Sequence, residues 1–160
     1  MMDVMNYLQS AKKNIFRFEY LQYYADDEDS LKYWRDTGTI NQDDMQAWWG
    51  FVESKSENGI KMSRVRRVLL PMNDYTKMEL QIHQLSNKRG DDIVVIFDDE
   101  FKKLKIRKKD FWLIDDDIVL EMQYSENGKF LGFKENKSAE EFIDIKKNLL
   151  DHSCAIKNVM

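Results

Sequence analysis

Basic side chains gather on one short stretch of the chain, at Lys61, Arg64, Arg66 and Arg67. Residues 60–70 are rich in Val, Leu and Arg and stop at Pro71, a pattern that predicts a strand. Because alternate residues of a strand point to opposite faces, Arg66 and Arg67 cannot both face solvent in a sheet covered by helices on both sides. At least one of them therefore needs a carboxylate partner.

Two carboxylates follow the turn at Pro71, namely Asp74 and Glu79. A helix that packs back onto the sheet would bring Glu79 within reach of the arginines. Buried arginines are usually paired, so the first interpretation is a structural ion-pair network, in which loss of Arg67 costs stability before activity. The second interpretation is an anion-binding site built on the same guanidinium groups.

Two runs of acidic residues, 98–100 and 115–117, could supply hard oxygen ligands for Mg²⁺ or Ca²⁺. The alternating acidic residues and central glycine of a calcium loop are missing, and adjacent aspartates in a turn point in different directions. Asp115, Asp116 and Asp117 are better explained as a tight hairpin turn between two strands. We therefore predict no metal site.

The usual catalytic groups are sparse, with two histidines, His83 and His152, and one cysteine, Cys154. No nucleophile elbow, phosphate loop or His-Glu-x-x-His motif is present. On a helix His152 and Cys154 would not meet, because side-chain neighbours there are three or four residues apart. The sequence indicates no catalytic residue and no cofactor.

Six of the eight residues from Lys102 to Lys109 are basic. On one face they could contact several phosphates of a nucleic acid, with an affinity that falls steeply as salt rises. The simpler interpretation is a solvated, lysine-rich loop or helix flank, because charge runs usually face water.

The elements that must position these groups begin with helical pieces in the first fifty residues. Residues 16–21 are ambiguous between strand and helix, and the acidic run 26–29 suits the start of a short helix carrying Leu31 and Trp34. A clearer helix is predicted over 42–56, with Asn41 as N-cap. Its buried stripe would consist of Met45, Trp48, Trp49 and Val52.

The second part of the chain is predicted to contain both strands and helices. After the strand over 60–70 we predict a helix capped by Asn73 or Asp74 and ending at Gly90, then a buried strand over 92–97. Strands over 111–114, 118–124 and 129–134 form a meander, with Asn127-Gly128 at its second turn. A last helix opens with a capping box, Ser138 and Glu141, and runs to Leu150. This order predicts a mixed α/β fold, a mixed sheet with a C-terminal meander, covered by helices.

Length and composition favour one domain, 1–160, in which a helical N-terminal part (1–57) packs on an α/β core (58–160). The chain is 42% hydrophobic and carries a formal charge of −4, which argues against a protein that coats nucleic acid over its whole surface. It has no run of eighteen apolar residues, and its start lacks the pattern of a signal peptide. With a single cysteine, we expect a cytoplasmic protein without a membrane partner.

Four stretches carry a resemblance to a known family. They are Trp48 or Trp49; Arg66-Arg67-Val68 with Pro71, Asp74-Tyr75 and Glu79; Gly90-Asp91-Asp92; and Asp110-Phe111-Trp112-Leu113-Ile114-Asp115-Asp116 with Met122, Tyr124, Gly128 and Leu131-Gly132. From about Trp48 to Phe133 the chain resembles an uncharacterised bacterial domain family, often encoded beside helix-turn-helix regulators in actinobacteria. With this resemblance, the candidate binding residues are Arg64, Arg66, Arg67, Asp74, Tyr75, Glu79, Trp112 and Asp115.

In its order of elements, that family is similar to one half of a phospholipase D-like fold. Active members of that superfamily carry a His-x-Lys motif after the first strands of the meander, whereas residues 118–134 contain no histidine. The resemblance therefore implies a pseudoenzyme or a ligand-sensing scaffold. Because such halves commonly pair across a two-fold axis, it also implies a homodimer.

Three functions follow as hypotheses. The first is a non-enzymatic regulatory, ligand-sensing or protein-interaction domain, partnering a DNA-binding helix-turn-helix regulator. The second is a phosphodiesterase or nuclease with a non-standard site, in which Arg66 or Arg67 binds phosphate and Asp74, Glu79 or Asp115 does metal or acid/base work. The third is nucleic-acid binding through Lys102–Lys109.

Overall fold

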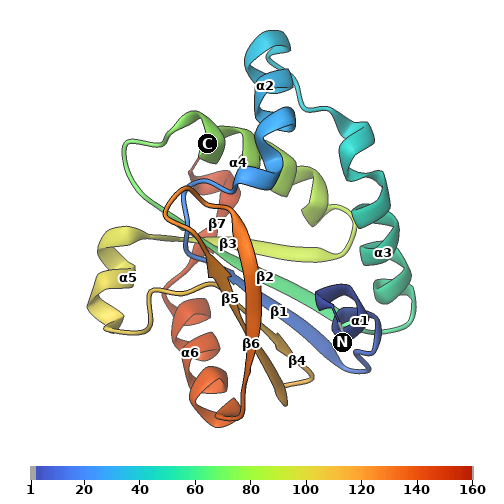
Figure 1. The fold of residues 1–160 in the computed structure, drawn as a ribbon, viewed down its shortest axis with the longest axis vertical. Coiled ribbons are helices and arrows are strands. Elements are labelled where there is room, and N and C mark those ends of the chain that lie inside the picture. Colours follow the sequence, from blue (N-terminus) through green and yellow to red (C-terminus); the bar gives the residue numbers. More distant parts are fainter. Residues whose placement is uncertain (1–2, 160) are drawn as a thin grey trace.

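The computed structural model describes residues 3–159 and contains a seven-stranded sheet in the order β6-β5-β4-β1-β2-β3-β7 (Figure 1). The strands are β1 (Asn14–Glu19), β2 (Lys61–Val68), β3 (Asp91–Phe97), β4 (Phe111–Ile114), β5 (Ile118–Tyr124), β6 (Phe130–Asn136) and β7 (Cys154–Ala155). The helices are α1 (Val4–Gln9), α2 (Glu28–Thr37), α3 (Gln46–Glu57), α4 (Asp74–Asn87), α5 (Asp98–Leu104) and α6 (Ala139–Asp151). Three 3-10 segments complete the chain: η1 (Ala25–Asp27), η2 (Gln42–Met45) and η3 (Ile156–Asn158).

The sheet is mixed. Strands β1, β2 and β3 are parallel and are joined by helical crossovers, whereas β4 pairs antiparallel with the other edge of β1. From β4 the chain continues as an antiparallel meander through β5 and β6. The predicted mixed α/β fold, with its C-terminal meander and its covering helices, is confirmed.

The division into a helical part (1–57) and a core (58–160) is wrong in one respect, because the ambiguous stretch after Asn14 forms strand β1. This strand lies in the middle of the sheet, between β2 and β4 (Figure 1). Its residues alternate strictly, with Phe16 and Phe18 on one face and Arg17 and Glu19 on the other, and all four are buried. The first part of the chain therefore belongs to the core itself.

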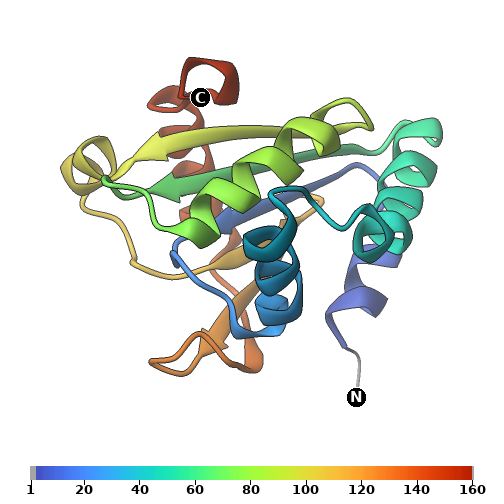
Figure 2. The ribbon, with the colours of Figure 1, turned by 90° about the horizontal axis from the view of Figure 1, so that it is seen from above.

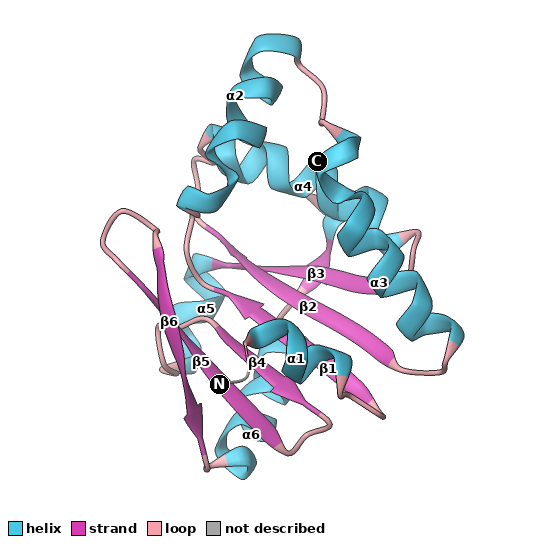
Figure 3. Ribbon diagram, turned by 45° about the vertical axis from the view of Figure 1, so that its right-hand side comes forward, coloured by secondary structure: helices cyan, strands magenta, loops and turns pink. Residues whose placement is uncertain are grey.

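The two faces of the sheet differ in chemistry. We call the face that bears Arg17 and Glu19 the arginine face, and the face that bears Phe16 and Phe18 the phenylalanine face. Helices α1 to α4 cover the first, and helices α5 and α6 cover the second (Figures 2 and 3).

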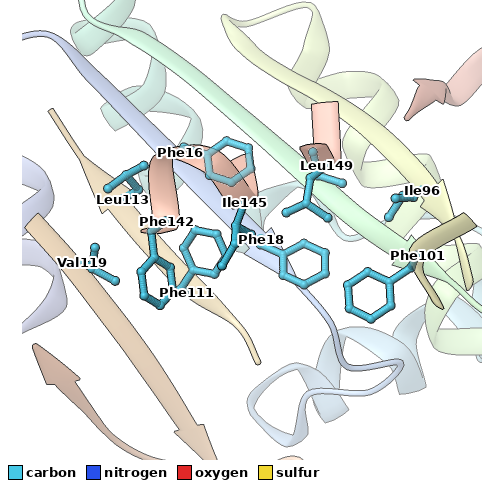
Figure 4. Packing of buried hydrophobic residues seen from close by; sticks show 11 residues of the cluster. Phe16, Phe18, Ile96, Phe101, Phe111, Leu113, Val119, Phe142, Ile145 and Leu149 are labelled. Atoms are coloured by element: carbon cyan, nitrogen blue, oxygen red, sulfur yellow. The ribbon is translucent and has the colours of Figure 1, made fainter. Parts of the chain in front are cut away.

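The phenylalanine face carries an apolar core. Phe16, Phe18 and Phe111 of the sheet pack against Phe101 of α5 and Phe142 of α6 (Figure 4). The rings of Phe111 and Phe142 meet edge to face, with centroids 4.9 Å apart. Burial of each such ring contributes about 1.5–3 kcal/mol, so this layer holds α5 and α6 to the sheet.

The arginine face has apolar packing at its two sides and charges in its middle. Trp112 and Met62 pack with Leu8 of α1 and Val52 of α3 on one side, while Ile93 packs with residues of α4 on the other. Between these clusters lie the buried arginines and carboxylates described below.

The predicted turn at Asp115-Asp116-Asp117 is confirmed. Strands β4 and β5 have the predicted bounds, and Asp115 and Asp116 adopt the positive φ values of 56° and 51° that a tight turn requires. The Asn127-Gly128 turn also leads into β6, which starts one residue later than predicted.

Two predicted helix starts are wrong in detail. The helix expected from Gln42 begins at Gln46, because residues 42–45 form η2 with Asn41 as its cap. The capping box of Ser138 and Glu141 is absent, since Ser138 makes no side-chain cap bond. The Glu141 carboxylate instead accepts hydrogen bonds from Arg107 at 3.0 and 3.1 Å.

Candidate functional site

A cavity of about 300 Å³ lies over the middle of the arginine face. We call it the arginine cavity. Its floor comes from strands β1 to β5, and its walls come from η1, η2, α3 and α4. The residues that line it are Arg17, Glu19, Tyr24, Asp26, Asp27, Met45, Trp48, Arg64, Tyr75, Glu79, Ile82, His83, Ser86, Asp91, Ile93, Trp112 and Tyr124.

The floor contains a row of three side chains that can only donate hydrogen bonds. Arg17 of β1 is the register partner of Arg64 on β2 and of Trp112 on β4. Laterally paired residues of a sheet point to the same face, so the three side chains stand next to one another. We call them the donor row.

The donor row keeps several of its donors unused. Among residues 3–159, buried nitrogens without a hydrogen-bond partner include Nε and Nη1 of Arg17, Nε of Arg64 and Nε1 of Trp112. Arg17 is only 4% exposed and Trp112 only 7%. Because an unmade buried hydrogen bond costs about 1–3 kcal/mol, four such donors in one cavity call for an acceptor group.

Glu19 neutralises two of the arginines on this face. Its Oε1 lies 2.8 Å from Nη1 of Arg64, and its Oε2 lies 2.5 Å from Nη2 of Arg66. Burial opposes ionisation of this carboxyl, but Arg66 and Arg64 outweigh it and hold the Glu19 pKa well below its ordinary value. Glu19 is therefore a carboxylate throughout the neutral range.

Asp110 holds Arg17 in place. Its Oδ2 lies 2.8 Å from Nη2 of Arg17 and also accepts a hydrogen bond from the Tyr24 hydroxyl, while its Oδ1 accepts from the backbone N–H of Tyr20. Burial raises the Asp110 pKa, and Arg17 opposes that effect. The orientation of Arg17 toward the cavity is thus set by a carboxylate that directly precedes β4.

Among residues 3–159, Glu79 has one distant cationic partner, Arg66. It lies on α4, and its Oε2 is 3.4 Å from Nη2 of Arg66. Burial raises the pKa of Glu79 to about 7, despite the opposing effect of Arg66. Near neutral pH this side chain therefore exists in both protonation states and can either donate or accept.

His83 lies one turn after Glu79 and is buried and neutral. Its Nε2 accepts a hydrogen bond of 2.8 Å from Nε of Arg66, so that nitrogen carries no proton. Burial and the neighbouring Arg66 hold the His83 pKa well below its ordinary value. His83 therefore accepts one hydrogen bond from Arg66 without adding a charge.

Aromatic rings surround the donor row. The Cζ of Arg64 lies 5.6 Å from the ring centroid of Trp48 and 5.6 Å from that of Trp112, and these two centroids are 6.1 Å apart, so the guanidinium lies against both indoles from one side. Arg17 lies 5.1 Å from the Trp112 ring. These contacts fix the planes of both guanidinium groups and leave their free N–H groups preorganised.

Five of the predicted binding residues meet around this cavity. Arg64, Tyr75, Glu79 and Trp112 line it, and Arg66 lies beneath, bonded to Glu19 and Glu79. The expected carboxylate partner for the paired arginines is confirmed for both of them, because Arg67 pairs with Asp98 at 2.6 Å.

The other three predicted residues lie elsewhere. Arg67 points to the phenylalanine face, where its Nε also donates to the carbonyl of Tyr20. Asp74 pairs with Arg35 at the surface, with 46% of its side chain exposed. Asp115 accepts hydrogen bonds from the backbone N–H groups of residues 12, 13 and 14 at 2.7–3.1 Å. Of the residues proposed for phosphodiester chemistry, Arg66 and Glu79 therefore lie together, whereas Arg67, Asp74 and Asp115 lie away from them.

The basic run Lys102–Lys109 does not form one free surface. Residues 102–104 end helix α5, where Lys102 pairs with Asp98 and Lys103 with Glu100. Arg107 binds Glu121 and Glu141. Intramolecular carboxylates thus engage half of the six basic groups.

Several site residues were missed from the sequence, chiefly Arg17, Glu19, Tyr24 and Asp91. A signal existed in the alternation of Arg17 and Glu19 with two phenylalanines, which indicates a strand with a charged face. The opposite charges of Glu19 and Arg66 would also favour pairing of their strands, but the register could not be read from one chain.

Within residues 3–159, no three His, Cys, Asp or Glu side chains are grouped as a metal site would need. Over the same residues, no helix has both the length and the apolar character needed to cross a membrane.

Comparison with known families gives one match. The model of a family described as "Domain of unknown function (DUF6879)" matches residues 2–158. Comparison with curated proteins gives no match.

Proposed function

The chain belongs to this family of unknown function, and we propose that it is a non-enzymatic sensing domain that binds a small polar ligand in the arginine cavity. The observation that carries the proposal is the donor row, with its four buried and unpartnered N–H-bearing nitrogens. Since these groups can only donate, the ligand must present acceptor oxygens, as a carboxylate or a phosphate does.

Binding accounts for the arrangement better than catalysis does. Reaction at the cavity would need a nucleophile positioned beside a base. His83 is engaged by Arg66 and Glu19 by two arginines, and the remaining candidate base, Glu79, has Arg66 as its hydrogen-bond partner and no Ser, Thr or Cys among residues 3–159. The arginines are held by fixed carboxylates and aromatic rings, which is the preorganisation that favours recognition of a planar anion.

The proposal also includes a protein partner of this domain. The resemblance to a family encoded beside helix-turn-helix regulators supports a complex with such a regulator, whose affinity would report whether the cavity is filled. The likeness to half of a phospholipase D-like fold and the homodimer that it implies stay predictions.

The ligand proposal is tested by titrating the purified domain with small carboxylates and with inorganic phosphate, while following the indole N–H resonances by NMR. The Trp112 resonance is assigned from its loss in Trp112→Phe. We expect a saturable shift of that resonance, because its unpartnered N–H gains an acceptor. If no probe moves it at millimolar concentration, the proposal is wrong.

The regulator proposal is tested separately. The resemblance predicts a helix-turn-helix regulator encoded beside this domain. The two proteins are co-expressed, and the mixture is run on a sizing column with light scattering. A joint peak supports the complex, and the mass of the isolated domain decides between monomer and homodimer. Separate peaks at micromolar concentration, both with and without the ligand found in the titration, would show that the regulator is not a partner of this domain.

A further inference from the structure

The wall of the arginine cavity that faces the donor row is acidic. Asp26 and Asp27 of η1 and Glu79 of α4 line it. Asp27 accepts a hydrogen bond from the Tyr75 hydroxyl at 2.5 Å, whereas Asp26 has no ion-pair partner among residues 3–159. These carboxyl groups are therefore available to a cationic or hydrogen-donating group.

The charges of the floor are already matched without this wall. Arg17 is paired with Asp110 at 2.8 Å, and Arg66 is paired with Glu19 at 2.5 Å. Arg64 shares Glu19 and lies 3.5 Å from Asp91. The acidic wall thus gives the cavity an excess of negative charge, which opposes entry of a ligand that is only an anion.

The cavity therefore has one end that favours a hydrogen-bond acceptor or anion and another end that favours a cation. Unpartnered N–H groups of the donor row define the inner end, and the exposed Asp26 lies at the opening. The rings of Tyr24 and Tyr75 also line the cavity, with centroids 5.9 Å apart. Carboxylates beside aromatic rings are a common setting for an ammonium group.

From this arrangement, and resting on the function proposed above, we propose that the ligand is a small zwitterion, an amino-carboxylic acid. Its carboxylate binds Arg17, Arg64 and Trp112, and its ammonium group binds Asp26, Asp27 and Glu79. A volume of about 300 Å³ admits a molecule of this size. Such a ligand supplies hydrogen-bond acceptors to the donor row and a positive charge to the carboxylates of the acidic wall. Because it is a zwitterion, the net charge of the cavity does not change.

The test is calorimetric titration of the full chain at pH 7.5 with the twenty common L-amino acids. For the one that binds best, two analogues follow, the 2-oxo acid without the ammonium group and the primary amide without the carboxylate. We expect each analogue to bind about 10- to 150-fold more weakly, since a hydrogen bond to a charged group is worth about 1.5–3 kcal/mol.

A variant pair separates the two ends of the ligand. Asp26→Asn removes an exposed, unpaired charge. It should weaken binding of the amino acid several-fold and should strengthen binding of the 2-oxo acid, an anion that Asp26 repels. Asp29→Asn is the matched control, because it lies in the same acidic run and does not line the cavity. Equal effects of the two variants would contradict the placement of the ammonium group.

The outcomes distinguish this inference from the function on which it rests. If the 2-oxo acid, succinate or phosphate binds as tightly as the best amino acid, the zwitterion is wrong and the sensing function stands. If no amino acid binds but the 2-oxo acid, succinate or phosphate does, the zwitterion is again wrong and the sensing function again stands. If none of these probes binds, both proposals fall.

Discussion

Glu19 and Arg66 are register partners on the parallel strands β1 and β2, and their side chains form an ion pair of 2.5 Å in which the arginine side chain is only 1% exposed. The same carboxylate binds Arg64, one position along the same face of β2. The pair thus fixes β1 against β2 and also orients the guanidinium that the donor row presents to the cavity.

Replacement of Arg66 by Met should destabilise the domain by about 3–5 kcal/mol, because it leaves Glu19 and the proton-free nitrogen of His83 buried with fewer partners. Chemical denaturation measures this change. Arg35→Met is the matched control, since Arg35 pairs with Asp74 at the surface and its loss should cost less than about 1 kcal/mol. Similar losses for the two variants would show that the buried network is not a source of stability.

The contribution of Glu79 to the free energy of unfolding should fall as the pH rises from about 5 to 8. Its pKa is about 7 in the folded protein, where burial disfavours the charge, and 4.5 in the unfolded chain. Between these values the folded state holds a proton that the unfolded state has lost, so rising pH favours unfolding.

Glu79→Gln removes this titration and keeps the shape of the side chain. The free energy of unfolding of the variant, relative to the unmodified protein, should rise by about 1–3 kcal/mol between pH 5 and pH 8. The other titrating groups are common to both proteins and cancel in the comparison. A difference that is flat with pH would mean that Glu79 is ionised at an ordinary pKa in the fold.

Asp115→Ala should destabilise the domain by about 3 kcal/mol, since the carboxylate accepts hydrogen bonds from the backbone N–H groups of residues 12, 13 and 14. Alanine would also be strained at the φ of 56°. Thermal unfolding measures the loss. Asp117→Ala, in the same turn but exposed, should change stability by less than about 0.5 kcal/mol. An equal, small effect at both positions would assign Asp115 no structural role.

Trp112→Phe should lower ligand affinity about ten-fold, because it deletes one donor of the donor row and keeps an aromatic ring. No hydrogen bond within residues 3–159 is lost, since Nε1 of Trp112 has no partner there. Trp49→Phe is the contrasting variant, because Nε1 of Trp49 donates to Oγ of Ser86 at 2.9 Å. Trp49→Phe should lose stability and keep affinity, as calorimetry and denaturation together will show.

The meander could be predicted nearly to the residue because its turns are set by local chemistry. The aspartates at 115 and 116 and Gly128 tolerate positive φ, and they fix where the flanking strands stop. The start of helix α4 could likewise be predicted from its N-cap, Asn73, whose side chain accepts a hydrogen bond from the backbone N–H of Thr76.

Strand β1 could not be assigned in the same way because it violates the usual link between charge and exposure. Arg17 and Glu19 alternate with phenylalanines as surface residues would, yet both are buried. Their burial depends on Asp110 and Arg66, which lie far away in the sequence. Nothing local to β1 reveals those partners.

Only those residues of the candidate site that lie close together in the sequence could be predicted to meet. Arg64, Arg66 and Glu79 lie close in sequence, so alternation along a strand and the return of the following helix bring them together. Arg17 and Trp112 join the row only through the register of β1 with β2 and β4, a tertiary property. Asp115 was correctly predicted in a turn. It does not line the cavity, because its carboxylate binds backbone groups, which the sequence does not name.

The place of β1 in the middle of the sheet also bears on how a growing chain folds. Its partners on β2 and β4 are distant, and the bond from Asn14 to Asp115 joins residues that are 101 positions apart. On the ribosome, β1, in which half of the residues are apolar, therefore keeps one edge unpaired until β4 has emerged. Long-range pairing of this kind slows folding and exposes strands that can aggregate. Synthesis of the domain should thus depend on chaperone protection of its first strand, more than its modest size suggests.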